Sequence, residues 1–156
     1  MIETLLFDFS RVLLHPTDKT YSGSLNTLHK QLKDDESYYL FHYFELNMQI
    51  LEFLKTLKGK FRLAIFTTDI IQDDPLIRKE IVPIFEKIYS ASKLNITKKI
   101  KESYQFIAND LKIKPEEILF IDDTRSNIIP AKEAGFKTHH YKTNAELLKF
   151  LESING

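Results

Sequence analysis

Acidic and hydroxyl side chains follow three apolar segments of the chain, "LLF", "LAIF" and "ILFI". These residues are Asp8, Ser10, Thr67, Thr68, Asp122 and Asp123. Carboxylates that converge repel one another unless a cation lies between them, and Mg2+ takes oxygen ligands while leaving room for a phosphate oxygen. If the three segments are neighbours, the residue types predict metal-assisted phosphoryl chemistry with Asp8 as the candidate nucleophile.

Lys98, in "LNITKKIKESY", is the candidate cation of the same site. It stands with Lys99 and Lys101 at the expected start of a helix, where the helix dipole disfavours positive charge. A lysine turned toward an anion would explain that placement. We therefore expect Lys98 to contact a phosphate, and Lys99 and Lys101 to form a solvated basic face.

The elements that must position these residues follow from the pattern of apolar residues. Buried strands are expected at 4–9, 62–66, 118–121 and 137–141, with a short fifth at 87–89. Helical stripes cover 46–57, 100–111 and 147–154, Asp74-Pro75 is a typical helix start, and Gly135 suits a helix end. Strands that alternate with helices predict an α/β fold with a Rossmann-like, three-layer core and a mainly parallel sheet. In such sheets ligands bind beyond the carboxyl ends of the strands.

The chain is expected to be one domain over 1–156, with a small helical insertion at about 15–45 after the first strand. The insertion contains turn signals, a possible helix at 25–32 and the aromatic cluster "YYLFHYF", which is expected to pack onto the core. An alternative interpretation of this cluster is a partial lid or a partner surface.

Composition narrows the possible functions. Lys plus Arg and Asp plus Glu both number 22, so the net charge is zero and general nucleic-acid binding is disfavoured. The chain has no cysteine, which excludes disulfides and thiolate chemistry. No apolar run reaches membrane-spanning length, and no signal-like segment opens the sequence. We expect a cytoplasmic protein without a membrane partner.

Four short motifs, in order, resemble those of the haloacid dehalogenase-like (HAD) superfamily. "LLFDFSRVLL" is similar to the first motif, Asp-x-Asp-x-(Val/Thr), with Asp8 at the nucleophile and Ser10 at the second aspartate. "LAIFTTD" resembles the second, with Thr67 at the phosphate-binding position. "LNITKKIKESYQF" resembles the third, where Lys98 precedes the aromatic by six residues and Asn95 replaces a glycine. "ILFIDDTRSNIIPAKEAGFKT" resembles the fourth closely.

The resemblance implies a Mg2+-dependent hydrolase, of the phosphatase class, that acts through an aspartyl-phosphate on Asp8. It implies catalytic roles for Asp8 and Lys98, and phosphate binding by Ser10, Thr67, Thr68 and Lys98. The metal ligands that it implies are Asp8, Ser10 through its carbonyl, Asp122, Asp123 and Asn127, with Asp123 the more direct of the acid pair. Receiver domains use similar groups, but there the acid pair comes first in the chain, so that fold is rejected.

Ser10 departs from the family pattern, because the aspartate there protonates the leaving group and activates water. A serine cannot replace it, and loss of one acid–base group costs about 100- to 10,000-fold in rate. Three interpretations follow: a slow phosphatase or one whose substrate has a good leaving group, a binding protein without turnover, and a hydrolase that borrows an acid from the insertion. The candidate replacements are Asp18, Asp34, Asp35, Glu36 and His42.

The short insertion leaves little chain for a cap over the site. By analogy with the family, this predicts an open site, a bulky or macromolecular substrate, or a lid that another subunit supplies. The substrate classes expected overall are a phosphorylated small molecule and a macromolecule. An oligomer is therefore possible.

Overall fold

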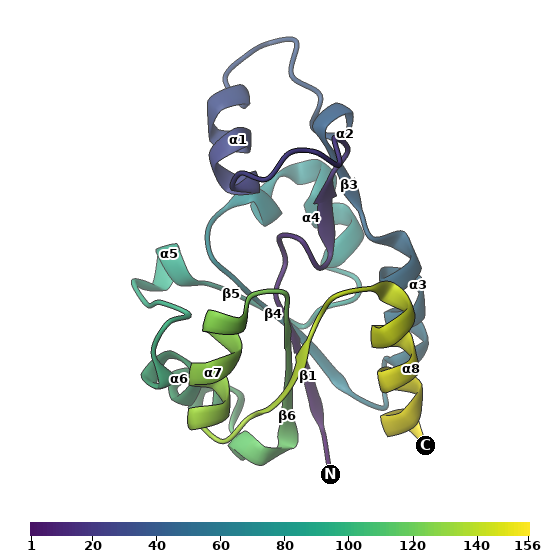
Figure 1. Ribbon diagram of the computed structural model, residues 1–156, viewed down its shortest axis with the longest axis vertical. Coiled ribbons are helices and arrows are strands. Elements are labelled where there is room, and N and C mark those ends of the chain that lie inside the picture. Colours follow the sequence, from purple (N-terminus) through teal and green to yellow (C-terminus); the bar gives the residue numbers. More distant parts are fainter.

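The computed structural model describes residues 1–156 and shows one five-stranded sheet in which all neighbouring strands are parallel (Figure 1). The spatial order is β5-β4-β1-β6-β7. Their bounds are β1 Thr4–Phe7, β4 Arg62–Thr67, β5 Lys87–Ser90, β6 Ile118–Asp122 and β7 Lys137–His140. The central strand β1 lies between β4 and β6, with Phe7 opposite Ile65 and Ile121. The predicted parallel sheet is confirmed, and the segments that end in Asp8, Thr67 and Asp122 are neighbours.

Helices cover both faces of the sheet, which makes the three-layer α/β architecture (Figure 1). Helices α3 (Met48–Leu57), α4 (Pro75–Ile81) and α8 (Asn144–Asn155) pack on the face that presents Leu5, Phe7 and Ile65. Helices α6 (Lys101–Leu111) and α7 (Arg125–Glu133) cover the other face, which presents Leu6 and Phe120. Alternate strand residues thus feed two separate apolar clusters, and their burial holds the sheet between the helix layers. None of these helices is long and apolar enough to span a bilayer.

Between β1 and α3 the chain forms a small subassembly beyond the carboxyl ends of the strands (Figure 1). It consists of β2 (Leu14–Pro16), α1 (Leu25–Leu32), α2 (Leu40–Tyr43) and β3 (Phe44–Leu46), and β2 pairs with β3 in antiparallel fashion. Leu25, Leu40 and Phe44 are buried in the larger apolar cluster. The aromatic segment therefore packs partly onto the core, while Tyr39 and Tyr43 stay exposed.

Local signals explain where several elements begin and end. Ser24 caps α1 by accepting a hydrogen bond from the Thr27 amide, and Asp74 caps α4 through the Leu76 amide. A short helix, α5 (Ala91–Leu94), ends at Asn95, which takes the left-handed conformation (φ +55°) that the glycine-like position required. Strand β1 ends at Phe7, two residues earlier than expected, because the Phe9 carbonyl accepts the amides of Val12, Leu13 and Leu14 and turns the chain.

Candidate functional site

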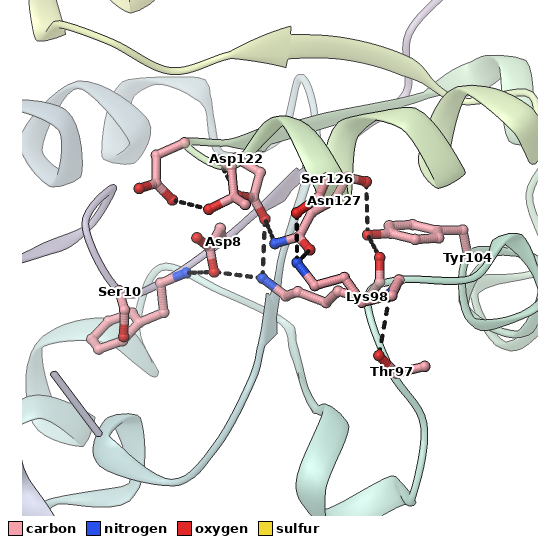
Figure 2. A network of polar contacts seen from close by, with 12 residues as sticks. Asp8, Ser10, Thr97, Lys98, Tyr104, Asp122, Ser126 and Asn127 are labelled. Atoms are coloured by element: carbon pink, nitrogen blue, oxygen red, sulfur yellow. Dashed lines mark hydrogen bonds and ion pairs between the residues drawn. The ribbon is translucent and has the colours of Figure 1, made fainter. Parts of the chain in front are cut away.

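A buried ion-pair cluster lies at the carboxyl edge of the sheet, where β1 and β6 end (Figure 2). The ammonium of Lys98 donates to Oδ1 of Asp8 at 2.5 Å and to Oδ2 of Asp122 at 3.2 Å. Lys98 is 4% exposed, and Asp122 is fully buried. Asp8 lies 90 positions from Lys98 in the chain and Asp122 lies 24 positions from it, yet both contact the same nitrogen. The sequence pattern predicted this convergence.

The cluster holds more negative than positive charge. Burial raises the pKa of Asp8 well above its ordinary value, and the neighbouring charge of Asp122 raises it further, whereas Lys98 opposes both. Burial on its own lowers the pKa of Lys98, but the charges of Asp8 and Asp122 outweigh it and raise that pKa. One ammonium thus faces two carboxylates in a dry setting, which is the electrostatic condition that a further cation would relieve.

Asp123 adds a third carboxylate to this edge. One oxygen each from Asp8, Asp122 and Asp123 lies within 4.8 Å of the others, and a hard divalent cation accepts such a set of oxygens. Burial raises the pKa of Asp123, and Asp122 raises it further. Asp122 already accepts hydrogen bonds from Lys98, from the Thr124 amide and from the Asn127 side chain, so Asp123 is the freer ligand. The donor set fits Mg2+.

Asn127, at the start of α7, is placed by two partners of opposite charge. Its Nδ2 donates to Oδ2 of Asp122 at 3.1 Å, and its Oδ1 accepts from the ammonium of Lys99 at 2.6 Å. Lys99 also donates to the Ser126 hydroxyl at 2.8 Å (Figure 2). Lys99 is exposed, as expected for a solvated basic face, but its ammonium also contacts the fourth motif.

Tyr104 holds the backbone at Lys98 and Asn127. Its hydroxyl lies 2.8 Å from the Lys98 carbonyl and 3.0 Å from the Asn127 carbonyl (Figure 2). The ring is fully buried and packs edge-on against Phe66 and Phe120. The aromatic six residues after Lys98 thus joins the third motif to the fourth, which sequence spacing alone did not explain.

The hydroxyl residues divide between the core and the surface of the site. Thr68 and Ser10 line a cleft of about 210 Å3, together with Asp8, Asp123 and Asn127. Thr67 does not line it: its side chain is fully buried, and its hydroxyl oxygen has no hydrogen-bond partner. Such an orphaned polar atom at the end of β4 is costly in a core that needs only packing.

Residues of the insertion form the outer wall of the cleft, and sequence reasoning missed the most connected of them. Ser24, Leu25 and Asn26 of the α1 start line it. The Oδ1 of Asn26 accepts the amides of Ile70 and Ile71 at 3.2 and 2.9 Å, and its Nδ2 lies 3.4 Å from Oγ of Ser10. In the sequence, Asn26 is a polar residue near the start of an expected helix and belongs to none of the four motifs. Nothing in the sequence therefore indicates its role.

Arg11 is the one cationic residue in the cleft lining. It has a left-handed backbone (φ +65°), uncommon for a residue with a Cβ, and its Nη2 donates to the carbonyls of Tyr21 and Gly23 at 3.0 and 2.8 Å. Arg11 therefore binds the loop before α1. A larger hollow of about 520 Å3, lined by Met1 and Gly59, shares no residue with this cleft.

Comparison with known proteins decides the family. The family model described as haloacid dehalogenase-like hydrolase matches residues 3–135. The chain belongs to this family. It is a HAD-like hydrolase by sequence. The first three motifs lie within the matched segment, and the fourth lies within it up to Gly135.

Solved structures share the fold. A HAD family enzyme from Bacteroides thetaiotaomicron, in complex with magnesium and inorganic phosphate, matches with a TM-score of 0.67 at 18% identity, over 92% of this chain and 96% of that one. A hydrolase from Streptococcus pneumoniae matches with a TM-score of 0.70 at 16% identity, over 97% and 98% of the two chains. At these identities the likeness concerns the fold alone.

The curated relatives that resemble this chain are much longer proteins. Bifunctional epoxide hydrolase 2 of Rattus norvegicus is 30% identical over 118 residues, which is 71% of this chain and 21% of that protein. D-ribitol-5-phosphate phosphatase of Bacteroides thetaiotaomicron is 38% identical over 61 residues, 39% of this chain and 30% of that protein. The HAD-like chain thus spans about a fifth to a third of these relatives.

Proposed function

We propose that this HAD-like hydrolase is a Mg2+-dependent phosphatase that acts through an aspartyl-phosphate on Asp8. The observation that carries the proposal is the meeting of Asp8, Lys98, Asp122 and Asp123 beside a polar cleft at the carboxyl edge of the sheet. A carboxylate in such a setting, exposed to the cleft on one side and held by an ammonium on the other, is a positioned nucleophile.

The side chains divide the work as follows. Lys98 orients Asp8 and supplies positive charge near the transferred phosphoryl group, and Tyr104 holds Lys98 in place. Thr68 offers a hydroxyl donor from the cleft wall, and the orphaned hydroxyl of Thr67 is a second candidate for phosphate. Asp8, Asp123 and the Ser10 carbonyl would hold Mg2+, with Asp122 and Asn127 supporting them from behind. When bound, Mg2+ would neutralise charge on the phosphoryl oxygens.

The proposed substrate is a phosphorylated small molecule. The cleft of about 210 Å3 is smaller than pockets that enclose drug-sized ligands, about 300–1,000 Å3, and ten of its eleven lining residues are not hydrophobic. Two relatives support this class by name: one was solved with magnesium and inorganic phosphate, and another is a phosphatase of a phosphorylated sugar alcohol. A cytoplasmic location and freedom from nucleic acid remain part of the proposal.

The second candidate function is a HAD-like module that binds phosphate or metal without turnover. Two observations favour it. Ser10 stands where the family has an acid, and Lys99 donates to the side-chain Oδ1 of Asn127, which could otherwise approach a bound metal. Neither alters Asp8 or Lys98, so the phosphatase explains more of the site.

Hydrolysis of acetyl phosphate with Mg2+ tests the proposal, with Asp8→Asn as the matched variant. The phosphatase predicts Mg2+-dependent release of phosphate by the wild type and loss of at least 1,000-fold, on the order expected for removal of a nucleophile, in Asp8→Asn. Equal rates for the two proteins would remove Asp8 from the mechanism. Tight binding of phosphate and Mg2+ with no hydrolysis of any substrate would establish the binding module instead.

A further inference from the structure

The cleft around Asp8 lacks a side chain that can deliver a proton to a leaving group. Its hydroxyl-bearing lining residues, Ser10, Ser24, Thr68 and Thr124, are poor acids, and no histidine lines it. The Oγ of Ser10 faces Nδ2 of Asn26, which donates to it, at 3.4 Å. The position beside the nucleophile is therefore occupied by a neutral hydrogen-bonding pair.

Asp69 is the remaining carboxyl group of the cleft besides Asp8 and Asp123. Its Oδ2 pairs with the ammonium of Lys30 on α1, and its Oδ1 accepts from the Ser92 hydroxyl at 3.3 Å. Both oxygens accept from other side chains, so the carboxyl group of Asp69 is held by Lys30 and Ser92. It ties α1 to the loop after β4.

The acids of the insertion do not replace the missing group. None of the side chains considered for this role lines the cleft: Asp18, Asp34, Asp35, Glu36 and His42. Asp18 and Asp35 bond to their own turns, through Thr20 and Ser37. Asn26 and the Asp69–Lys30 pair hold α1 where it is, so the wall that faces the leaving group is a fixed one.

We propose that this site is selective for phosphoryl compounds whose leaving group departs as a weakly basic anion, namely acyl phosphates and phosphate esters of acidic phenols or enols. The inference rests on the proposed phosphatase function and names the substrate class of that site. The leaving group of an alkyl phosphate is a strongly basic alkoxide. Its departure requires a proton that this cleft does not supply.

The transfer step is balanced without an acid. An Oδ of Asp8 forms a bond to phosphorus, the bond from phosphorus to the leaving oxygen breaks, and the electron pair stays on that oxygen. For acetyl phosphate the product is acetate, whose charge is delocalised and needs no proton. In the second step water bonds to phosphorus, the bond to Asp8 breaks with its pair returning to the carboxylate, and the water proton passes to solvent.

A leaving-group series tests this inference. Turnover is measured with Mg2+ on acetyl phosphate, on p-nitrophenyl phosphate, on phenyl phosphate and on glycerol phosphate, for the wild type, Ser10→Asp and Ser10→Asn. Asp and Asn have nearly the same shape, so their difference isolates the proton. We expect wild-type kcat/KM to fall steeply from acetyl to glycerol phosphate, and the fall to be much shallower in Ser10→Asp. The gain on glycerol phosphate should be about 100- to 10,000-fold in Ser10→Asp and absent in Ser10→Asn.

The outcomes separate the two levels of the argument. Wild-type hydrolysis of glycerol phosphate at the rate of acetyl phosphate, or identical series for Ser10→Asp and Ser10→Asn, would overturn the selectivity while leaving the phosphatase intact. Failure of the wild type on all four compounds would overturn the phosphatase itself, and the selectivity with it.

Discussion

Lys98 is the counter-ion of a cluster with too many carboxylates, so replacing it should destabilise the metal-free protein strongly. The ammonium of Lys98 lies 5.3 Å from the centre of the Phe66 ring. Lys98→Met keeps an unbranched side chain of similar length and removes the charge and its hydrogen bonds. Asp8 and Asp122 are then left buried without a cation. Removing one partner of a buried pair costs about 3–5 kcal/mol.

The same charge balance predicts the opposite response to Asp8→Asn. This variant removes one of the two carboxylates that face Lys98 and leaves the Lys98–Asp122 pair in place. Because burial already raises the pKa of Asp8, the neutral amide is the better occupant of that position in the metal-free state. We expect Asp8→Asn to unfold at the same or higher urea concentration than the wild type.

Urea unfolding in EDTA, followed by circular dichroism, measures both effects. Thermal melts of the same samples should show the loss of about 3–5 kcal/mol in Lys98→Met as a fall of roughly 6–20 °C in Tm. Lys101→Met is the matched control, since Lys101 is exposed and should lose less than about 0.5 kcal/mol. A Lys98→Met protein as stable as the control, or an Asp8→Asn protein that is clearly less stable than the wild type, would refute the charge argument.

Three further perturbations address the surroundings of the site. Lys99→Met should tighten Mg2+ binding by about three- to tenfold in titration calorimetry, because it removes a cation beside the proposed dication and frees the Asn127 oxygen. Asn26→Leu should cost about 2–4 kcal/mol in urea unfolding, since two loop amides lose their acceptor. Burial lowers the pKa of His29 in the folded protein. As pH falls below about 6.5, His29 therefore takes up a proton in the unfolded chain before it does so in the folded one, and stability should decline until the lower native pKa is passed. His29→Gln should flatten part of that decline.

Each of the three has a matched control. Lys101→Met should leave Mg2+ affinity unchanged, and a weaker affinity in Lys99→Met would show that Lys99 supports the site instead of opposing it. Asn26→Asp keeps the acceptor for both amides and should lose less stability than Asn26→Leu; equal losses would contradict the assigned bonds. His42→Gln, on the exposed side of α2, should keep the full acid sensitivity of the wild type, and an equal flattening in both histidine variants would exclude His29 as its source.

Much of the fold could be predicted because it depends on local pattern. The expected strands match those of the main sheet to within two residues. Strands β1, β4 and β6 are buried and nearly all apolar, as strands inside a parallel sheet must be, whereas the edge strand β7 has the polar sequence KTHH and no buried residue. The capping residue Asp74 indicated the start of α4 for the same local reason. The pair β2–β3 was missed, because strands of three residues that include Pro16 carry no periodic signal.

The sequence predicted the site residues that follow the ends of strands. It did not predict the residues whose roles depend on contacts with side chains far away in the sequence. Asp8, Lys98 and Asp122 could be placed together because the sheet brings its carboxyl ends to one edge. Asn26, Lys99 and Arg11 act through contacts 16 to 45 residues apart or through carbonyls, which residue type does not reveal. Whether Thr67 or Thr68 meets phosphate likewise depends on which way each side chain turns at the end of β4.

Trapping the covalent intermediate tests the central claim most directly. The wild type and Asp8→Asn are mixed with acetyl phosphate and Mg2+, quenched in acid and digested, and the peptides are examined by mass spectrometry. We expect one added phosphoryl group on the wild-type peptide that contains Asp8, sensitive to hydroxylamine as an acyl phosphate should be, and none in Asp8→Asn or with EDTA. A phosphoryl group on another residue, or turnover with no phosphorylated peptide at any quench time, would contradict it.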